Sequence, residues 1–390
     1  MRRHRLWSVP LAIALAASLS FCAAPPQRAT RAPAPEARSP APAPAPAPEV
    51  RVAPVIPAPA PPAPAAAPAP QVPTAAPVTL LLPLRAPDFQ SAAEAVRAGV
   101  MAAQVATASK APIDVRATDA SAENVVAEYA AAIAAGTRVV VGPMTRTAVS
   151  AVAAAPPSTI ATLALNQPET SVTLPDRFYT FGLAIDTESR MVARAAWEQG
   201  FRTAFVVGST TPLARRSREA FVEEWAALGG KVTGNFEAGA NADYTALRNA
   251  VARSQQDVAF LAAEADAART LRPYLGSTVA VYATSQINDG RDDRVGDADM
   301  NGVRFVDMPW IVQPSSPAVV GYPRPQGMPP ALERFYALGI DAYRIATELA
   351  AGRTNFAFDG VTGRITVGTG GVVERRPVVA TYRQGARVAE

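Results

Sequence analysis

Short apolar segments alternate with amphipathic segments from residue 78 to residue 282. Val78-Thr79-Leu80-Leu81-Leu82 predicts a buried strand, and the apolar positions between 90 and 108 recur at helical spacing. Strands that alternate with helices are typical of an α/β fold built on parallel sheets. The pattern predicts further strands at 113–117, 138–141, 160–165, 203–207, 231–236, 257–261 and 278–282, and further helices at 121–135, 145–154, 187–199, 213–228, 243–253 and 264–275.

The C-terminal third departs from this alternation. A strand is predicted at 303–307, followed by a proline-rich loop and a long helix at 329–351. The helix carries one apolar stripe at spacings of three and four residues, formed by Leu332, Phe335, Gly339, Ala342, Ala346 and Leu349. Two β-branched runs flank a glycine-rich turn and predict a β-hairpin, with strands at 364–367 and 378–382 and the turn at 368–371.

The alternation is complete once by residue 165 and then begins again. We therefore predict an α/β protein with two doubly wound Rossmann-like lobes, between which the chain returns in its last third. The predicted organisation is a signal peptide at 1–21, an acylated cysteine and Ala/Pro-rich linker at 22–77, a first lobe at 78–182 plus 303–355, and a second lobe at 183–302 plus 356–390.

The N-terminus has the layout of a bacterial secretory signal. Arginines at positions 2, 3 and 5 precede an apolar run that ends at Cys22. The run Leu19-Ser20-Phe21-Cys22 is similar to a lipobox, which predicts lipidation of Cys22 and attachment to a membrane. Phe21 departs from that pattern, because the residue before the cysteine is normally small. Cleavage that leaves a soluble periplasmic protein is the alternative.

Residues 25–77 hold 19 of the 38 prolines, mostly alternating with alanine. Such a segment buries little apolar surface, and proline interrupts helices and sheets, so we expect a disordered, extended linker. Residues 1–24 carry a net charge of +3 and residues 25–77 a net charge of +2, out of +4 for the whole chain. The remaining residues, 78–390, are thus almost neutral at −1, which does not favour nucleic acid as a partner.

The side-chain inventory argues against an enzyme. His4 and Cys22 are the only histidine and cysteine, and both lie in the N-terminal segment. A Ser-His-Asp triad therefore cannot form in the lobes, and the chain has no G-x-S-x-G motif. Asp297-Ala298-Asp299-Met300-Asn301-Gly302 imitates the start of an EF-hand loop, but Met308 occupies the twelfth position, where calcium needs a carboxylate. We expect neither a catalytic residue nor a metal or other cofactor.

A ligand cleft is expected beyond the carboxyl ends of the strands. Thr145 begins a predicted helix, so it either contributes to an anion site or simply caps that helix. Glu264 and Asp266 are the acids that could receive an ammonium group, although both also suit a helix start. The residues that follow predicted strands, and so form the candidate cleft, are Asp88, Phe89, Met144, Thr145, Asn166, Gln167, Ser209, Thr210, Thr211, Ser285 and Gln286.

Several segments in order resemble one known family. These are Val141-Gly142-Pro143, Leu163-Ala164-Leu165-Asn166-Gln167-Pro168-Glu169, Tyr282-Ala283-Thr284-Ser285, Arg334-Phe335-Tyr336-Ala337-Leu338-Gly339-Ile340-Asp341-Ala342-Tyr343, and Phe358-Asp359-Gly360-Val361-Thr362-Gly363-Arg364-Ile365. The set is similar to the LppC/LpoA family of penicillin-binding-protein activators, whose domain has a type I periplasmic-binding-protein-like fold. The likeness covers most of residues 78–388. The chain departs from better-studied members because the Ala/Pro-rich linker stands where they carry a helical-repeat domain.

The resemblance implies a lipoprotein attached to the inner leaflet of the outer membrane through acylated Cys22. It also implies that the protein activates a peptidoglycan synthase, a class A penicillin-binding protein, by binding it in the periplasm. Trp310, Tyr322 and Met328 are candidates for the partner surface, since tryptophan and tyrosine are favoured at binding hot spots. For Trp310, packing under the proline-rich loop is the competing interpretation. The competing functions are a periplasmic solute-binding receptor for an amino acid or muropeptide, and a protein that binds peptidoglycan itself.

Overall fold

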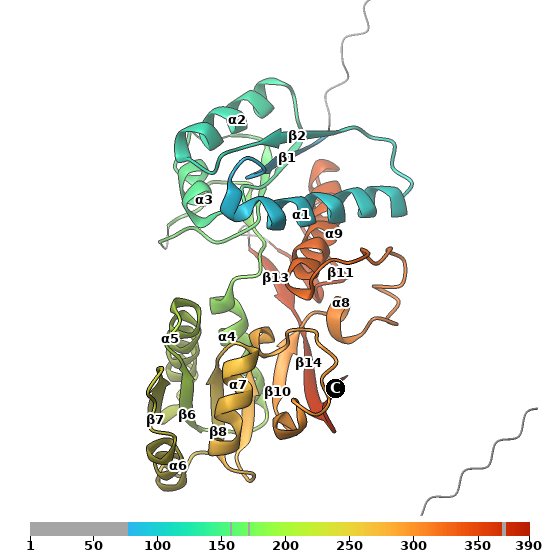
Figure 1. The fold of residues 1–390 in the computed structure, drawn as a ribbon. Helices are drawn as coiled ribbons and strands as arrows, with labels where there is room; N and C mark the ends of the chain where they lie inside the picture. The colour runs from blue at the N-terminus through green and yellow to red at the C-terminus, as the bar shows by residue number, and fades with distance from the viewer. Residues whose placement is uncertain (1–76, 157, 171, 369–371) are drawn as a thin grey trace, which may run out of the picture. The chain divides into compact units, whose positions relative to one another are not determined.

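The computed structural model describes residues 77–156, 158–170, 172–368 and 372–390. The chain divides into two units, residues 1–68 and 69–390, and the fold described here belongs to the second unit (Figure 1). The predicted signal peptide, Cys22 and most of the Ala/Pro-rich linker lie outside the described residues. Among the helices that are described, none has the length and hydropathy needed to cross a membrane.

The first lobe is built on a five-stranded parallel sheet of order β2-β1-β3-β4-β5. Leu80 and Leu82 of β1 face one core, while Leu81 between them faces another, as the two-residue period of a strand requires. Helices α1 and α9 cover the first face, and α2 and α3 cover the second. The bounds are β1 Val78–Leu82, α1 Pro87–Ala106, β2 Ile113–Ala117, α2 Ala122–Ala134, β3 Val139–Val141, α3 Arg146–Ala153, β4 Ala161–Ala164, β5 Phe178–Thr180 and α9 Pro330–Ala350.

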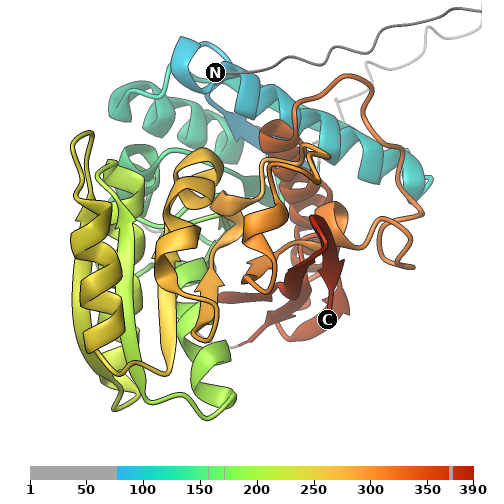
Figure 2. The same ribbon diagram turned by 60° about the horizontal axis from the view of Figure 1, so that its bottom comes forward.

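The second lobe is built on a seven-stranded sheet of order β15-β14-β10-β9-β8-β6-β7. Figure 2 brings this sheet and its helices forward. Helices α4 and α5 pack on one face, and α6 and α7 pack on the other. The bounds are α4 Ile185–Glu198, β6 Thr203–Ser209, α5 Pro212–Ala227, β7 Lys231–Ala238, α6 Tyr244–Arg253, β8 Val258–Ala262, α7 Ala265–Leu271, β9 Ala280–Ala283, β10 Arg304–Asp307, β14 Val378–Arg383 and β15 Ala386–Ala389.

A small antiparallel sheet of order β11-β12-β13 completes the first lobe. Its buried residues Ile365 and Val367 belong to the same core as α1 and α9. A single bridge from Val372 to Thr180 continues the edge of the five-stranded sheet at β5. The bounds are β11 Phe356–Asp359, β12 Arg364–Val367 and β13 Val373–Arg376, and a short helix α8, Pro309–Val312, follows β10.

The structure differs from the sequence prediction in the last third of the chain. Residues 303–355 are expected in the first lobe, and α9 does pack on the first core, but β10 pairs with β9 and β14 of the second sheet. Residues 356–376 were expected in the second lobe, but they pack on the first core. The predicted hairpin between 364–367 and 378–382 is also wrong, because β12 pairs with β13 and β14 pairs with β10 and β15. Antiparallel partners depend on long-range packing, which local sequence does not encode.

Helices α1 and α9 cross at two glycines. A Cβ atom on Gly99 would lie 1.9 Å from the backbone oxygen of Tyr336, and one on Gly339 would lie 2.1 Å from that of Val96. The two helix backbones therefore approach more closely than any residue with a Cβ atom would allow at these two positions. The predicted apolar stripe of α9 is part of a larger buried surface, since nearly all side chains from Tyr336 to Ala346 are buried. The close crossing fixes α9, and with it the N-terminal end of α9 that reaches the site described next.

Candidate functional site

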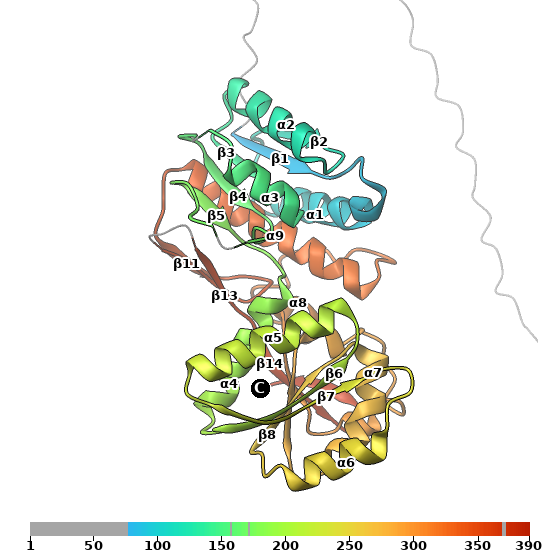
Figure 3. The ribbon, with the colours of Figure 1, turned by 90° about the vertical axis from the view of Figure 1, so that its left-hand side faces the viewer.

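A cavity of about 610 Å³ lies between the N-terminal end of α9 and the loops that follow β8 and β9. Figure 3 shows α9 with the first lobe, and β8 and α7 in the second. The α9 side is mainly apolar, while the loop side carries most of the charged groups. The cavity is lined by Leu183, Glu188, Glu264, Ala265, Asp266, Ser285, Gln286, Asn288, Asp289, Arg291, Pro329, Pro330, Ala331, Arg334 and Phe335.

Glu264 is held in place by two hydroxyl groups of the β6 end. Ser209 Oγ donates a hydrogen bond of 2.9 Å to its carboxylate, and Thr211 Oγ1 donates another of 2.5 Å. Partial burial raises the pKa of Glu264, but these hydrogen bonds outweigh burial and bring the pKa below its ordinary value. Glu264 is therefore ionised at neutral pH. Within the described part of the chain, no cationic side chain lies within ion-pair distance of it.

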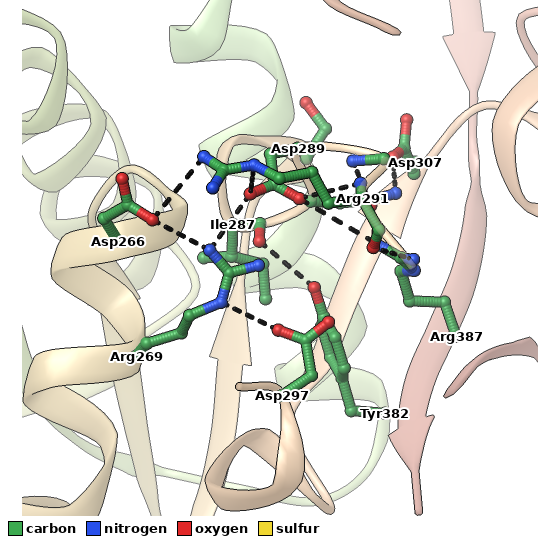
Figure 4. Close-up of polar contacts among 12 residues, drawn as sticks. Asp266, Arg269, Ile287, Asp289, Arg291, Asp297, Asp307, Tyr382 and Arg387 are labelled. Carbon is green, nitrogen blue, oxygen red and sulfur yellow. Dashed lines mark hydrogen bonds and ion pairs between the residues drawn. The ribbon is translucent and has the colours of Figure 1, made fainter. Parts of the chain in front are cut away.

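An ion-pair network surrounds Arg269 next to the cavity (Figure 4). The Arg269 guanidinium donates to Asp266 at 2.9 Å, Asp289 at 3.0 Å and Asp297 at 2.8 Å. Burial lowers the pKa of Arg269, but its hydrogen bonds with Asp289 and Asp297 outweigh burial and raise it above the ordinary value. Arg291 also reaches Asp289, at 3.0 Å. Each of these acids therefore already has an arginine partner.

Two buried ion pairs connect the lobes beside the cavity. Arg334 of α9 donates to Asp307 at the end of β10 at 2.7 Å, and to the backbone oxygen of Asn288 at 2.9 Å. Glu188 of α4 pairs with Arg375 of β13 at 3.2 Å. Glu188, Asp307 and Arg375 are almost completely buried. Because a charge left alone in such a place is strongly destabilising, these pairs hold α9 and β13 against the second lobe.

The lining of the cavity is therefore unbalanced in charge. Glu188, Asp266 and Asp289 each have an arginine partner, and the lining cations Arg291 and Arg334 are both engaged. Glu264 is the lining acid without an ion pair among the described residues. The arrangement can bind and orient a positively charged group.

The structure brings together some of the residues that the sequence singled out for the cleft. Ser285 and Gln286 line the cavity, and Ser209 and Thr211 stand behind Glu264. Thr210 is exposed beside them. Glu264 itself was considered from the sequence as a receptor for an ammonium group.

The first-lobe residues of the predicted cleft lie elsewhere. Met144 is buried in the first core, so it is not available to a ligand. Thr145 accepts a hydrogen bond of 3.3 Å from the Ala148 N–H and caps α3, which agrees with the capping interpretation. The others are not among the lining residues: Asn166 donates to Met144 O, Gln167 donates to Thr180, and Asp88 and the exposed Phe89 begin α1.

Sequence reasoning did not identify the four residues of the two interlobe pairs. Glu188, Asp307, Arg334 and Arg375 occur at ordinary places on helices and strands, and only the tertiary fold buries them. The sequence shows these residues only as charged side chains on predicted helices and strands. Most charged side chains in such places are exposed, so nothing in the sequence indicates that these four are buried.

Trp310 does not form an exposed anchor. Its side chain is fully buried, Nε1 donates 2.8 Å to Glu333, and the Arg324 guanidinium lies 4.2 Å from the centre of its ring. The packing interpretation is therefore the one that fits. Tyr322 and Met328 are half-buried. Tyr322 lines a second, open hollow of about 460 Å³ together with Thr107 and Arg344.

The EF-hand-like segment is engaged in the protein's own contacts. Asp297 is buried and pairs with Arg269, and Asp299 lies in a short 3₁₀ turn, Ala298–Met300. Within the described residues, no group of three or more His, Cys, Asp or Glu side chains is arranged to hold a metal ion.

Two doubly wound α/β lobes with a cleft at their junction define a type I periplasmic-binding-protein-like fold. Within this class, the chain matches the model of the family described as "LppC putative lipoprotein" over residues 69–238 and 246–385. The chain belongs to this family, as the ordered sequence segments indicated.

Two curated relatives illustrate the match. The chain is 26% identical over 336 residues to the penicillin-binding protein activator LpoA of Photobacterium profundum, covering 76% of this chain and 54% of the relative. It is 27% identical over 322 residues to LpoA of Haemophilus influenzae, covering 80% and 54%. The chain thus spans about half the length of the curated relatives it matches.

Two solved structures show the same fold. The C-domain of LpoA from Haemophilus influenzae, described as a regulator of PBP1A, superposes with a TM-score of 0.67 at 26% identity, covering 80% of this chain and 99% of that chain. A structure described as a "putative branched-chain amino acid ABC transporter" from Chromobacterium violaceum gives a TM-score of 0.67 at 35% identity, covering 78% and 99%.

Proposed function

We propose that this protein activates a penicillin-binding protein by binding it, without catalysing a reaction itself. The observation that supports the proposal is the LppC family match across both lobes, together with relatives named as penicillin-binding protein activators. A binding protein can activate an enzyme only if it binds the active conformation more tightly than the inactive one. The partner that we propose is a class A penicillin-binding protein in the periplasm.

The proposal is tested by reconstitution. The purified protein is added to a class A penicillin-binding protein from the same organism, and glycan polymerisation and peptide crosslinking are followed separately. We expect a complex and a faster rate of at least one of the two reactions. Unchanged rates without a complex would contradict the proposal, and a complex without stimulation would reduce it to binding alone.

The partner surface is tested by placing a charge at exposed valines of each lobe. Val320 is exposed next to Tyr322 on the first lobe, and Val295 is exposed on a loop of the second. If the first lobe carries the contact, Val320→Glu weakens stimulation and Val295→Glu does not, because a buried unpaired charge is costly at an interface. The opposite result assigns the contact to the second lobe. Equal thermal stability of the two variants is the control.

We further propose anchoring to the outer membrane through an acylated Cys22. The family description as a lipoprotein and the lipobox-like sequence support this location. Mass analysis of the mature N-terminus tests it directly. A diacylated cysteine is expected as the first residue, and an unmodified terminus after residue 22 would contradict the anchor.

A solute-binding receptor is the second candidate function. It is favoured by the cleft at the lobe junction and by the likeness to the Chromobacterium violaceum structure. A screen of amino acids and muropeptides by thermal unfolding would test it, since a ligand that binds only the folded protein raises its melting temperature. Pelleting with purified peptidoglycan separates both candidates from a wall-binding protein.

A further inference from the structure

We propose that the cavity at the lobe junction binds a small organic cation: an alkylammonium group, received by Glu264, attached to an apolar body that packs on the α9 side. The ligand needs no carboxylate. This inference does not depend on activation of a synthase, because it concerns a small molecule in the cavity and not a protein surface.

The ammonium group is assigned by charge. Every other acid of the lining has an arginine partner at 2.9–3.2 Å, and the lining arginines are themselves engaged. Glu264 lacks such a partner within the described residues, yet two hydroxyl donors fix its orientation. A preoriented carboxylate at the edge of a cavity gains most from a ligand that donates charged hydrogen bonds.

The apolar residues on the α9 side of the cavity indicate that the ligand carries an apolar body. Leu183 and Phe335 are both half-buried, and with Pro329, Pro330 and Ala331 they present carbon surface to the cavity. A volume of about 610 Å³ lies within the range of about 300–1,000 Å³ typical of small-molecule sites. The cavity therefore has room for an apolar group considerably larger than the ammonium group alone.

A carboxylate on the ligand finds no counterpart. The hydroxyl of Thr145, which stands at a helix N-terminus of the first lobe, caps its own helix and does not line the cavity. The lining arginines are held by Asp307, Asp289 and Asp266. A ligand carboxylate would have to displace one of these pairs, so a simple amine should bind better than an amino acid with the same side chain.

Isothermal titration calorimetry of the purified protein tests this with three matched probes. These are 2-phenylethylamine, the neutral 2-phenylethanol and the zwitterion L-phenylalanine, which differs from the amine only by its carboxylate. We expect the amine to bind at least about tenfold more tightly than the alcohol, since a charged hydrogen bond contributes about 1.5–3 kcal/mol and each 1.4 kcal/mol is a factor of ten. We also expect it to bind more tightly than L-phenylalanine, because the lining arginines that a ligand carboxylate would need are already paired.

Variants connect the binding to Glu264. Glu264→Gln keeps an oxygen acceptor for Ser209 and Thr211 but loses the charge, so amine affinity should fall about tenfold or more. Ser209→Ala should give a smaller loss, because one orienting donor remains. Glu219→Gln removes the same charge from an exposed site of α5 outside the cavity and should leave amine affinity unchanged.

Three outcomes would overturn the proposal. They are no binding of 2-phenylethylamine at millimolar concentration, equal affinity for the amine and L-phenylalanine, and equal amine affinity of Glu264→Gln and the parent. Normal melting temperatures of the variants exclude misfolding as the cause of a loss. A negative result in the amine titration would not contradict the proposed activation of a synthase. A negative result in the synthase assay would not contradict amine binding.

Discussion

At the scale of single residues, Asp341 has a structural role that its position in a helix does not suggest. Its buried carboxylate accepts hydrogen bonds from the Val361 N–H at 3.1 Å and from the Thr362 N–H at 2.8 Å, and from Thr362 Oγ1. Asp341→Ala leaves buried donors without acceptors, each at about 1–3 kcal/mol. With three donors affected, we expect the free energy of unfolding to fall by about 3 kcal/mol or more in urea titrations.

Asp359 provides the matched control for this prediction. Its exposed side chain pairs with Arg364, and such a pair contributes about 0–1 kcal/mol. Asp359→Ala should therefore change the free energy of unfolding little. If Asp341→Ala were as mild as Asp359→Ala, the buried carboxylate would not support the turn after β11.

The pH dependence of stability should include a contribution from Asp289. Burial raises its pKa, but hydrogen bonds from the Arg269 guanidinium and the Arg291 N–H outweigh burial and hold the pKa below the ordinary value of 3.8. The folded state then favours the ionised form, so the contribution is present above pH 3.8 and is lost as pH falls through the folded pKa. Asp289→Asn should flatten the pH dependence of the unfolding free energy below about pH 5. If the unfolding free energy of Asp289→Asn fell with acid as steeply as that of the parent, the prediction would be wrong.

Residue-level chemistry could be predicted only in part. The sequence offered capping as one of two roles for Thr145 and drew attention to Glu264, because both stand at element boundaries. It could not show that Met144 and Trp310 are buried, since an apolar residue after a strand serves equally in a core or on a surface. Charge patterns gave no sign that Glu188 and Arg375, 187 residues apart, form a buried pair.

At the scale of elements, the crossing of α1 and α9 sets how the first lobe presents its end to the cavity. Gly99→Ala places a methyl group against the backbone of Tyr336, where no side chain can rotate away. Overpacking costs typically about 1–3 kcal/mol and exceeds the gain of about 1 kcal/mol in helix propensity. We expect a lower melting temperature in thermal unfolding.

Gly321 is the control for the crossing. A Cβ atom there meets nothing within 4 Å, and its backbone does not require glycine. Gly321→Ala should leave the melting temperature nearly unchanged. A Gly99→Ala variant as stable as Gly321→Ala would mean that the helices separate at little cost.

Elements were predicted more reliably than their partners. The strand at 113–117 has the predicted bounds, and most other elements of the two lobes differ by only a few residues, because apolar period and turn residues are local signals. Strand β10 was placed in the wrong lobe, and β14 was given the wrong partner. Contacts with residues far away in the chain decide which sheet a strand joins. The local sequence pattern therefore predicts neither the sheet of β10 nor the partner of β14.

At the scale of the whole described unit, the two lobes are connected by three chain crossings and by the pairs Arg334–Asp307 and Glu188–Arg375. Removing one partner of a buried pair leaves an uncompensated charge, which costs about 3–5 kcal/mol. Each lobe nevertheless has cores of its own. The buried pairs should therefore contribute more to the coupling between lobes than to the fold of either lobe.

Differential scanning calorimetry can separate coupling from stability. The parent protein should unfold in one transition for residues 69–390, whereas the double variant Arg334→Met and Arg375→Met should show two, because lobes that no longer stabilise each other unfold independently. The matched double variant Arg353→Met and Arg364→Met removes two exposed arginines and should keep one transition. A single transition that merely moves to lower temperature in the first double variant would show that the chain crossings and apolar contacts alone couple the lobes.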